Sequence, residues 1–346
     1  MNMSEKPRYM VLLCWILLWS LIGWGSLPLA AAAQPEPAKL KVLLLPHLSF
    51  APFFIAQEEG YFAEQGLDIE FVRMAKIDQA VPSLARGELD VITGDLRASI
   101  FNAIARGSQI RIVADKGHIG SETECAYVGV LARRALVESG ALDDPSMLRG
   151  RKMFMNPLSS SAYYMEKMLA TGGLTLDDVI VQTGLRGPVY AEALQTGALD
   201  LSASAQPWLT RILQMGHAVL YMPANEVIPG FQHAAIYYGP NLLQDNPDLG
   251  QRFMIAYLQA VRQYNQGKTP RNIDIIATAT TIEPQLVEDA CWAAIHSDGH
   301  INAQSVLEFQ QWILDKAALD QIVTEDLFWD GRFIEHANQE LAPLQK

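Results

Sequence analysis

Two short polar segments, each placed before an expected helix, hold the residues best suited to bind an anion or a carbonyl group. Thr93-Gly94-Asp95 precedes a helix expected from residue 96, and Ser159-Ser160-Ser161 opens another. The first N–H groups of a helix lack intrahelical partners and lie at the positive end of its dipole. Neighbouring hydroxyls can turn to suit an acceptor. Capping alone would explain one of the serines, and Asp95 could equally be an N-cap.

Further candidates fall in other expected loops, beyond the ends of strands, where open α/β sheets bind their ligands. Asp115-Lys116-Gly117-His118 is one such loop. Aromatic side chains, including Tyr163, could stack on a flat organic ligand, although such residues more often belong to a core. The candidate ligand-binding residues are Ser49, Phe50, Thr93, Gly94, His118, Ser159, Ser160, Ser161, Tyr190, Gln206 and Trp208.

The sequence contains no familiar pattern for catalysis or metal binding. Gly-x-Ser-x-Gly, phosphate-loop and His-Glu-x-x-His motifs are absent from it. His296 and His300 have the spacing of a metal pair, but Gly299 should end the helix between them and no third ligand is nearby in the sequence. His47, His118 and His233 fall in expected cleft or hinge loops, where a single His is more often an ordinary residue. We therefore expect no catalysis, no metal and no cofactor.

Apolar strands and amphipathic helices alternate along the chain, which predicts parallel α/β sheets. A first series has strands at 40–45, 69–72, 89–92 and 110–114, with helices at 53–64, 77–86 and 96–106. A second has strands near 126–131, 152–155, 179–182, 199–203 and 218–221, with helices near 159–171, 189–196 and 207–215. From Pro247 onward we expect mainly helices, at 251–264, 285–296 and 303–319.

Two blocks of the chain carry an ordered set of residues that also occurs in one protein family. The first comprises Ser49, Pro52, Ala56, Gly60, Tyr61, Phe62, Gly66, Leu67, Asp68 and Ile69, and the second reads Leu-Ala-Arg-Gly-Glu-Leu-Asp-Val-Ile-Thr-Gly over 84–94. This pattern resembles the nitrate/sulfonate/taurine (SsuA/THI5-like) type of periplasmic solute-binding proteins of ABC importers. These residues mostly build the scaffold, so the resemblance indicates a family and not a ligand.

The resemblance implies an α/β, two-lobed periplasmic-binding-protein-like (type II) fold with hinge strands and C-terminal helices. Lobe 1 would comprise 39–124, lobe 2 with the outward hinge 125–233, and the return hinge with the helices completing lobe 1 would comprise 234–346. The chain would cross outward at 125–131 and return at 233–239. The three serines would be the family's Gly/Ser-rich ligand loop. Relatives often have Trp-Glu-Pro where this chain has Gln206, so a cation-contacting role does not carry over.

The function implied is capture of a small organic or anionic solute, sulfonate-, nitrate-, taurine- or pyrimidine-like, between the lobes. The protein would be a monomer that delivers the solute to a membrane permease. An exported solute sensor is an alternative that the sequence leaves open. A second is an enzyme of the thiamine-pyrimidine synthase-like branch, but that branch carries a Cys-rich iron-binding motif, and no Cys cluster occurs in this sequence.

Residues 1–33 read as an export signal. Lys6 and Arg8 give a basic start, no charged residue follows from Met10 to Ala33, and the segment ends in small residues. An uncleaved anchor is the alternative, because the apolar stretch could span a bilayer. Cys14 lacks the small neighbours of a lipoprotein signal. We therefore expect a periplasmic protein.

Export places the protein in an oxidising compartment, which bears on its cysteines, and its net charge bears on its partners. Beyond the signal the chain keeps Cys125 and Cys291, which could pair, although two small buried thiols are the favoured interpretation. The formal net charge of −12 over 346 residues argues against nucleic acid or an anionic membrane as a partner.

We predict that the exported protein begins near Gln34 and is soluble, because the uncharged run ends there in four alanines. Intact-mass spectrometry of the exported protein checks this. An intact Met1 with retention in the membrane would contradict it.

Overall fold

The computed structural model describes residues 36–45, 48–74, 77–121 and 125–342. Pro37–Lys346 form one compact unit. The expected export signal and His47 lie outside the described residues. None of the helices in the described ranges is long and apolar enough to cross a membrane.

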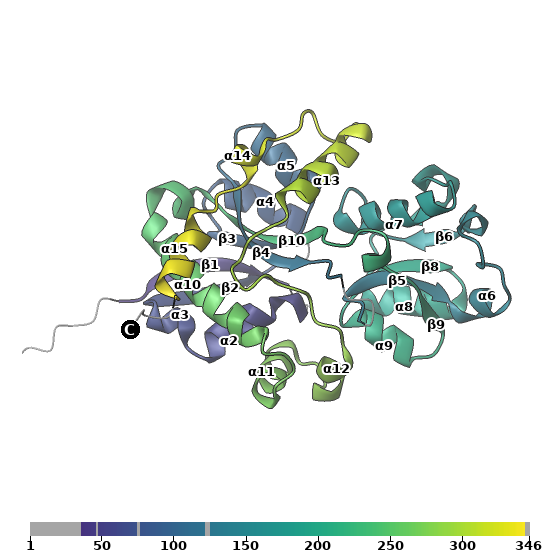
Figure 1. The fold of residues 1–346 in the computed structure, drawn as a ribbon, viewed down its shortest axis with the longest axis horizontal. Helices are drawn as coiled ribbons and strands as arrows, with labels where there is room; N and C mark the ends of the chain where they lie inside the picture. Colours follow the sequence, from purple (N-terminus) through teal and green to yellow (C-terminus); the bar gives the residue numbers. More distant parts are fainter. Residues whose placement is uncertain (1–35, 46–47, 75–76, 122–124, 343–346) are drawn as a thin grey trace, which may run out of the picture. The chain divides into compact units, whose positions relative to one another are not determined.

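The first of two five-stranded sheets has the order β2-β1-β3-β10-β4. Its strands are β1 (Ala38–Leu44), β2 (Leu67–Arg73), β3 (Val91–Asp95), β4 (Arg111–His118) and β10 (Gln232–Tyr238). β1 runs parallel to β2 and β3, whereas β10 lies antiparallel between β3 and β4. Figure 1 shows this sheet together with the helices of both ends of the chain.

The second sheet has the order β7-β6-β8-β5-β9. Its strands are β5 (Val128–Arg133), β6 (Lys152–Phe154), β7 (Ile180–Gln182), β8 (Leu201–Ala205) and β9 (Ala218–Pro223). β6 is parallel to β7 and β8, and β5 is antiparallel to β8 and β9. The α/β class is thus confirmed, but all-parallel sheets are wrong. β5 and β10 are the first strands after the chain changes sheet, and each enters in the reverse direction.

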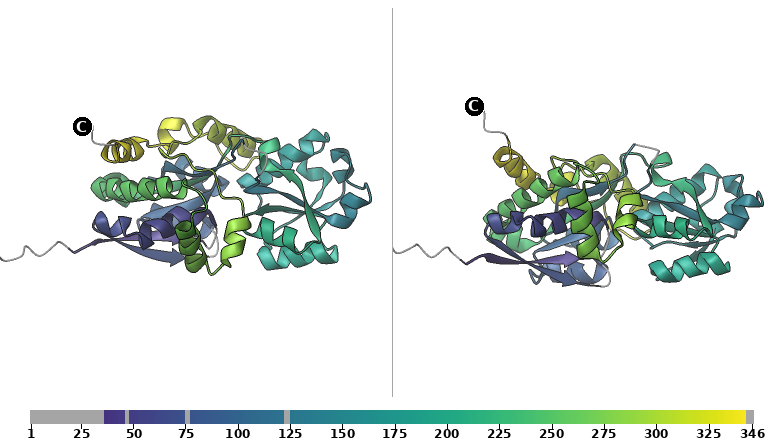
Figure 2. Two further views of the ribbon diagram at one scale, coloured as in Figure 1. Left: turned by 60° about the horizontal axis from the view of Figure 1, so that its bottom comes forward. Right: turned by 90° about the horizontal axis from the view of Figure 1, so that it is seen from below.

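The helices follow the predicted alternation closely. The first series contains α2 (Ala51–Glu58), α3 (Tyr61–Glu64), α4 (Ile77–Ala85) and α5 (Ala98–Ala105), and the second α6 (Arg134–Glu138), α7 (Ser160–Thr171), α8 (Gly187–Thr196) and α9 (Trp208–Gln214). The C-terminal part contains α10 (Pro247–Tyr264), α11 (Pro270–Thr280), α12 (Pro284–Asp289), α13 (Ala303–Asp315), α14 (Glu325–Phe328) and α15 (Arg332–Glu340). α15 lies alongside α10, which in turn packs on α2 (Figure 2).

Two expected helices differ in the structure. The helix expected at 53–64 is divided into α2 and α3, because Gly60 adopts a left-handed φ of 80° between them. The helix expected at 285–296 ends at Asp289. Beyond it the backbone pairs with β4 instead, where the His118 N–H donates to the Ala294 carbonyl at 2.9 Å.

Cys125 and Cys291 form a disulfide, so the favoured interpretation of two free thiols was wrong. The cysteines are separated by 166 residues, and only the tertiary structure brings them together. Cys125 lies between β4 and β5, where the chain passes from the first sheet to the second, and Cys291 follows α12. The bond therefore ties this crossing to the C-terminal part of the chain.

We predict that replacing both cysteines by Ser lowers the free energy of unfolding by about 2–4 kcal/mol, because the cross-link restricts a long loop of the unfolded chain. Denaturant unfolding of both proteins, followed by circular dichroism, measures the difference. A reducing agent should destabilise the wild type and leave the double variant unchanged. Equal stability of the two oxidised proteins would contradict the prediction.

Candidate ligand-binding site

The two polar segments meet directly, through their backbones. The Ala98 N–H donates to the Leu158 carbonyl and the Ser160 N–H to the Leu96 carbonyl, both at 3.1 Å. Arg97 and Ser159 thereby form an antiparallel bridge. The loop after β3 and the start of α7, which follow strands of different sheets, are joined at this point.

This contact overturns the reason for which the two segments were predicted to bind. Thr93 and Gly94 lie within β3, paired with β10, and α5 begins only at Ala98. The Ser160 N–H is already bonded to Leu96. Gly94 leaves no room for a side chain, since a Cβ would lie 2.0 Å from Ile77. Thr93, Gly94 and Ser160 therefore do not offer free N–H groups of a helix start.

Asp95 is not an N-cap either. Arg97 occupies the position before α5, without a side-chain cap, and its guanidinium donates to Asp95 at 3.1 Å. The charge of Asp95 acts on the pKa of Lys116, Tyr127, Tyr164, His233 and Tyr237. These effects, the Lys116–Ser49 and Arg97–Asp95 contacts and the backbone bond of Ser160 to Leu96 connect a group of polar side chains. We call it the Asp95 cluster: Ser49, Thr93, Asp95, Arg97, Lys116, Tyr127, Ser160, His233 and Tyr237.

Lys116 is the least expected member of this cluster. The residues from Asp115 to His118 were expected to form a loop, but β4 continues through them, with Lys116 only 2% exposed. Its ammonium donates to Ser49 Oγ at 2.6 Å and lies 4.1 Å from the centre of the Phe50 ring. Burial lowers the pKa of Lys116 to about 7, although Asp95 and Asp115 oppose the shift. Sequence reasoning missed this residue, and its position directly after an apolar strand was the available signal.

Burial also sets the protonation of two neighbours. The pKa of His233 falls to about 4, chiefly because the ring is buried, so the imidazole is neutral at pH 7. The pKa of Tyr127 rises to about 12 for the same reason, although its hydrogen bond with Ser49 favours ionisation. Both side chains can therefore act as neutral hydrogen-bonding groups.

Four buried polar atoms of the Asp95 cluster have no hydrogen-bond partner among the described residues. They are Thr93 Oγ1, Ser160 Oγ, His233 Nδ1 and Tyr237 Oη. Their residues come from β3, β10 and the first turn of α7. An unpaired buried hydroxyl costs about 1–3 kcal/mol, so such atoms are uncommon in folded proteins unless a water molecule, an ion or a ligand completes them.

The three serines have different tasks. Ser159 Oγ donates to the Asn156 carbonyl at 2.7 Å and lies 2.8 Å from Ser161 Oγ. Ser161 Oγ accepts from the Asn156 N–H at 3.2 Å. These two hydroxyls hold the loop, and Ser160 alone keeps an unpaired hydroxyl.

The remaining candidates of the second sheet have partners of their own. Gln206 donates to the Ala126 carbonyl and accepts from the Thr210 N–H. Tyr190 stacks on Phe154, with ring centres 5.0 Å apart. Trp208 packs so closely on Gly187 that a Cβ there would lie 2.0 Å from its ring. Contact of these three with a ligand stays a prediction.

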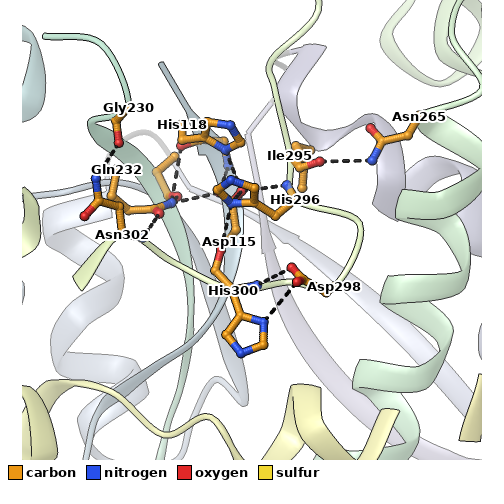
Figure 3. A network of polar contacts seen from close by, with 12 residues as sticks. Asp115, His118, Gly230, Gln232, Asn265, Ile295, His296, Asp298, His300 and Asn302 are labelled. Atoms are coloured by element: carbon orange, nitrogen blue, oxygen red, sulfur yellow. Dashed lines mark hydrogen bonds and ion pairs between the residues drawn. The ribbon is translucent and has the colours of Figure 1, made fainter. Parts of the chain in front are cut away.

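His118 belongs to a second polar group, shown in Figure 3. Its Nδ1 lies 2.8 Å from Asp115 Oδ2, and His296 Nδ1 lies 3.2 Å from the same oxygen. Burial opposes ionisation of Asp115, but the hydrogen bonds from both histidines keep its pKa below the ordinary value. The two rings considered as a pair in the sequence, those of His296 and His300, do not face each other: the His300 ring lies beside Asp298, and His296 Nδ1 lies 2.9 Å from the His300 carbonyl oxygen.

Two surface hollows of the described structure lie away from the Asp95 cluster. One of about 350 Å³ is lined by α4 and α5, and another of about 340 Å³ by α7, α13 and the turn before β10. Neither is lined by a residue of the cluster. Most of the cluster is buried, and the side chains of Asp95 and Arg97 are 19% and 15% exposed.

A family model described as "NMT1/THI5 like" matches residues 47–266. Among curated proteins, the nitrate/nitrite binding protein NrtA of Nostoc sp. is 22% identical over 67% of this chain and 55% of its own length. The match thus spans about half of that relative.

Solved structures share the fold at low identity. A ligand binding component of an ABC-type import system from Staphylococcus aureus, with zinc bound, has a TM-score of 0.71 at 15% identity, covering 87% of this chain and 99% of its own. The alkanesulfonate-binding protein SsuA from Xanthomonas axonopodis pv. citri has a TM-score of 0.67 at 18% identity, covering 86% of this chain and 99% of its own. The desulfurization enzyme DSZB has a TM-score of 0.60 at 15% identity, covering 88% of this chain and 99% of its own.

We predict that Lys116→Met has a higher melting temperature than the wild type at about pH 6. The difference between the two melting temperatures should become smaller towards about pH 9. The folded pKa of about 7 lies below the unfolded value, so between these values the unfolded chain binds more protons. Wild-type stability therefore rises with pH through this window, whereas the methionine variant lacks the dependence.

Thermal unfolding at both pH values measures this difference. Lys39→Met, at an exposed position on β1, is the matched control and should give the same small offset at each pH. A difference for Lys116→Met that does not change with pH would contradict the prediction.

Proposed function

This chain belongs to the NMT1/THI5-like family, and from that premise we propose that it is the exported solute-binding component of an ABC importer. The observation that carries the proposal is the Asp95 cluster. Residues that follow strands of both sheets contribute to it, and it includes both unpaired polar atoms and a buried lysine. A solute that completes those atoms would bind between the sheets and be released when they separate.

We assign the two sheets to two lobes. Residues 39–124 and 234–346 would form one lobe and 125–233 the other. In support, the chain passes from the first sheet to the second between β4 and β5, and returns between β9 and β10. The 96–98 and 158–160 segments would then close the lobes onto the solute.

The chemistry of the cluster favours a small solute with an anionic oxygen group. Thr93 and Ser160 offer hydroxyl donors, and Lys116 offers a positive charge already removed from water. Asp95 offsets one positive charge, so a monoanion suits the cluster better than a multiply charged ion. Nitrate and sulfonates meet these conditions. A zwitterion such as taurine would in addition place its ammonium near Asp95.

The partner would be a membrane permease, reached in the periplasm by a monomeric protein. A sensor that binds the same solute is the second candidate, and only the membrane partner distinguishes it. We do not propose an enzyme, although DSZB shares the fold. Within the described residues the cysteines are joined in the disulfide, and the Thr93 and Ser160 hydroxyls have no base in hydrogen-bond contact.

We predict that Ser160→Ala and Thr93→Val each weaken solute binding by about 10- to 100-fold, since a hydrogen bond to a charged group contributes about 1.5–3 kcal/mol. Without solute their stability should equal or exceed that of the wild type, because each substitution removes a buried hydroxyl that has no partner. The measurement is calorimetric titration with nitrate, taurine and short alkanesulfonates, together with thermal unfolding.

Ser305→Ala is the matched control. Ser305 is also buried, but its hydroxyl donates to Asn302 and accepts from the Gln232 N–H. This variant should lose stability and keep the wild-type affinity. Wild-type affinity of both Ser160→Ala and Thr93→Val would show that the Asp95 cluster is not the solute site.

A further inference from the structure

The second polar group, formed by Asp115, His118 and His296, has the composition of a metal site. Two imidazoles and a carboxylate are a common set of protein ligands for a zinc ion that keeps a fourth position open. One donor atom from each residue lies within 4.8 Å of the others. We propose that these three side chains bind a divalent transition-metal ion such as Zn²⁺, independently of the solute.

The distances between donor atoms suit such an ion. Asp115 Oδ2 lies 2.8 Å from His118 Nδ1 and 3.2 Å from His296 Nδ1. Ligand atoms about 2.0–2.1 Å from a tetrahedral zinc ion are separated by roughly 3.3 Å. The donor atoms are therefore already at about the spacing that the ion requires, and the direction of the rings is what has to change.

The carboxylate is held in place from its other side. Asp115 is fully buried, and its Oδ1 accepts from the Gly117 N–H at 2.7 Å and from the Gln232 amide at 2.8 Å. Gln232 is itself fixed, because its amide oxygen accepts from the Asn302 N–H at 3.1 Å. Outer contacts of this kind orient metal ligands and raise their affinity, so the site has support beyond its three ligands.

The two histidines come from distant parts of the chain, and separate bonds bring them together. Residues 115 and 296 are 181 positions apart, yet the His296 N–H donates to Asp115 Oδ2 at 2.9 Å. The His118 N–H donates to the Ala294 carbonyl, and the Cys125–Cys291 disulfide joins the same two segments. The backbone thus fixes the spacing of the ligands.

Solvent reaches the site from the side of His296, whose side chain is 46% exposed. A water molecule could therefore occupy the fourth position. The imidazoles are stacked, with ring centres 3.8 Å apart and planes 11° apart (Figure 3). Parallel rings cannot both direct Nδ1 at one ion in their own planes, so the more exposed ring, that of His296, must turn. Metal binding should consequently break the stack.

The test is titration of the EDTA-treated, dialysed full-length mature protein with ZnCl₂ alone, followed by calorimetry. We expect one ion per chain with a dissociation constant on the order of 1 μM or tighter. His118→Ala and His296→Ala should each weaken binding by at least about 100-fold. CoCl₂ should give the visible absorption of a tetrahedral site. In NMR, zinc binding should shift the signals of the His118 and His296 imidazole rings, because the stack breaks.

His300→Ala is the matched control, because His300 is exposed, belongs to the same segment and lies beside Asp298 instead of Asp115. It should bind zinc like the wild type. Circular dichroism without metal checks the fold, and His296→Ala decides the question if His118→Ala does not fold. Absence of binding at micromolar zinc, or equal loss in His300→Ala, would overturn the proposal.

Discussion

The short backbone pairing between residues 96–98 and 158–160 is the contact on which the rest of the site depends. It joins the loop after β3 to the first turn of α7, using hydrogen bonds that would otherwise go to water. Of the Asp95 cluster around it, Lys116 and Ser160 are buried and the Asp95 side chain is 19% exposed. Burial lowers the effective dielectric, which makes each polar contact stronger and each missing one more costly. Burial is also the largest cause of the pKa shifts of Lys116 and His233.

Much of the fold followed from the sequence, because periodic apolar residues and glycine breaks are local signals. The strands and helices of both series, and the long helix α10, lie close to their expected positions. The predictions that failed concern segments whose structure depends on partners far away in the chain. Residues 115–118 carry Asp, Lys and Gly, which suggest a loop, yet pairing with β10 extends the strand through them. The 291–296 segment is extended because β4 and Cys125 hold it.

The sequence pointed to several residues of the Asp95 cluster, but not to the atoms that they leave unpaired. The sequence directed attention to Thr93 and Ser160 for their helix-start N–H groups, whereas the structure gives their hydroxyls as the unpaired atoms. Lys116 could not be assigned because burial of a lysine is set by the walls that surround it. The pairing of His118 with His296 was equally hidden, since sequence spacing pointed to His300.

The unequal tasks of the three serines bear on how such a protein diversifies. Ser159 and Ser161 are tied to Asn156, so a change at either alters the shape of the loop and, through it, the contact between the sheets. The Ser160 hydroxyl makes no hydrogen bond to the rest of the loop. If the proposed function holds, selection for a different solute could act on position 160 by single substitutions that remove no hydrogen bond of the loop. The loop thus contains one position, 160, whose side chain its hydrogen bonds do not constrain, beside two positions, 159 and 161, whose side chains they do.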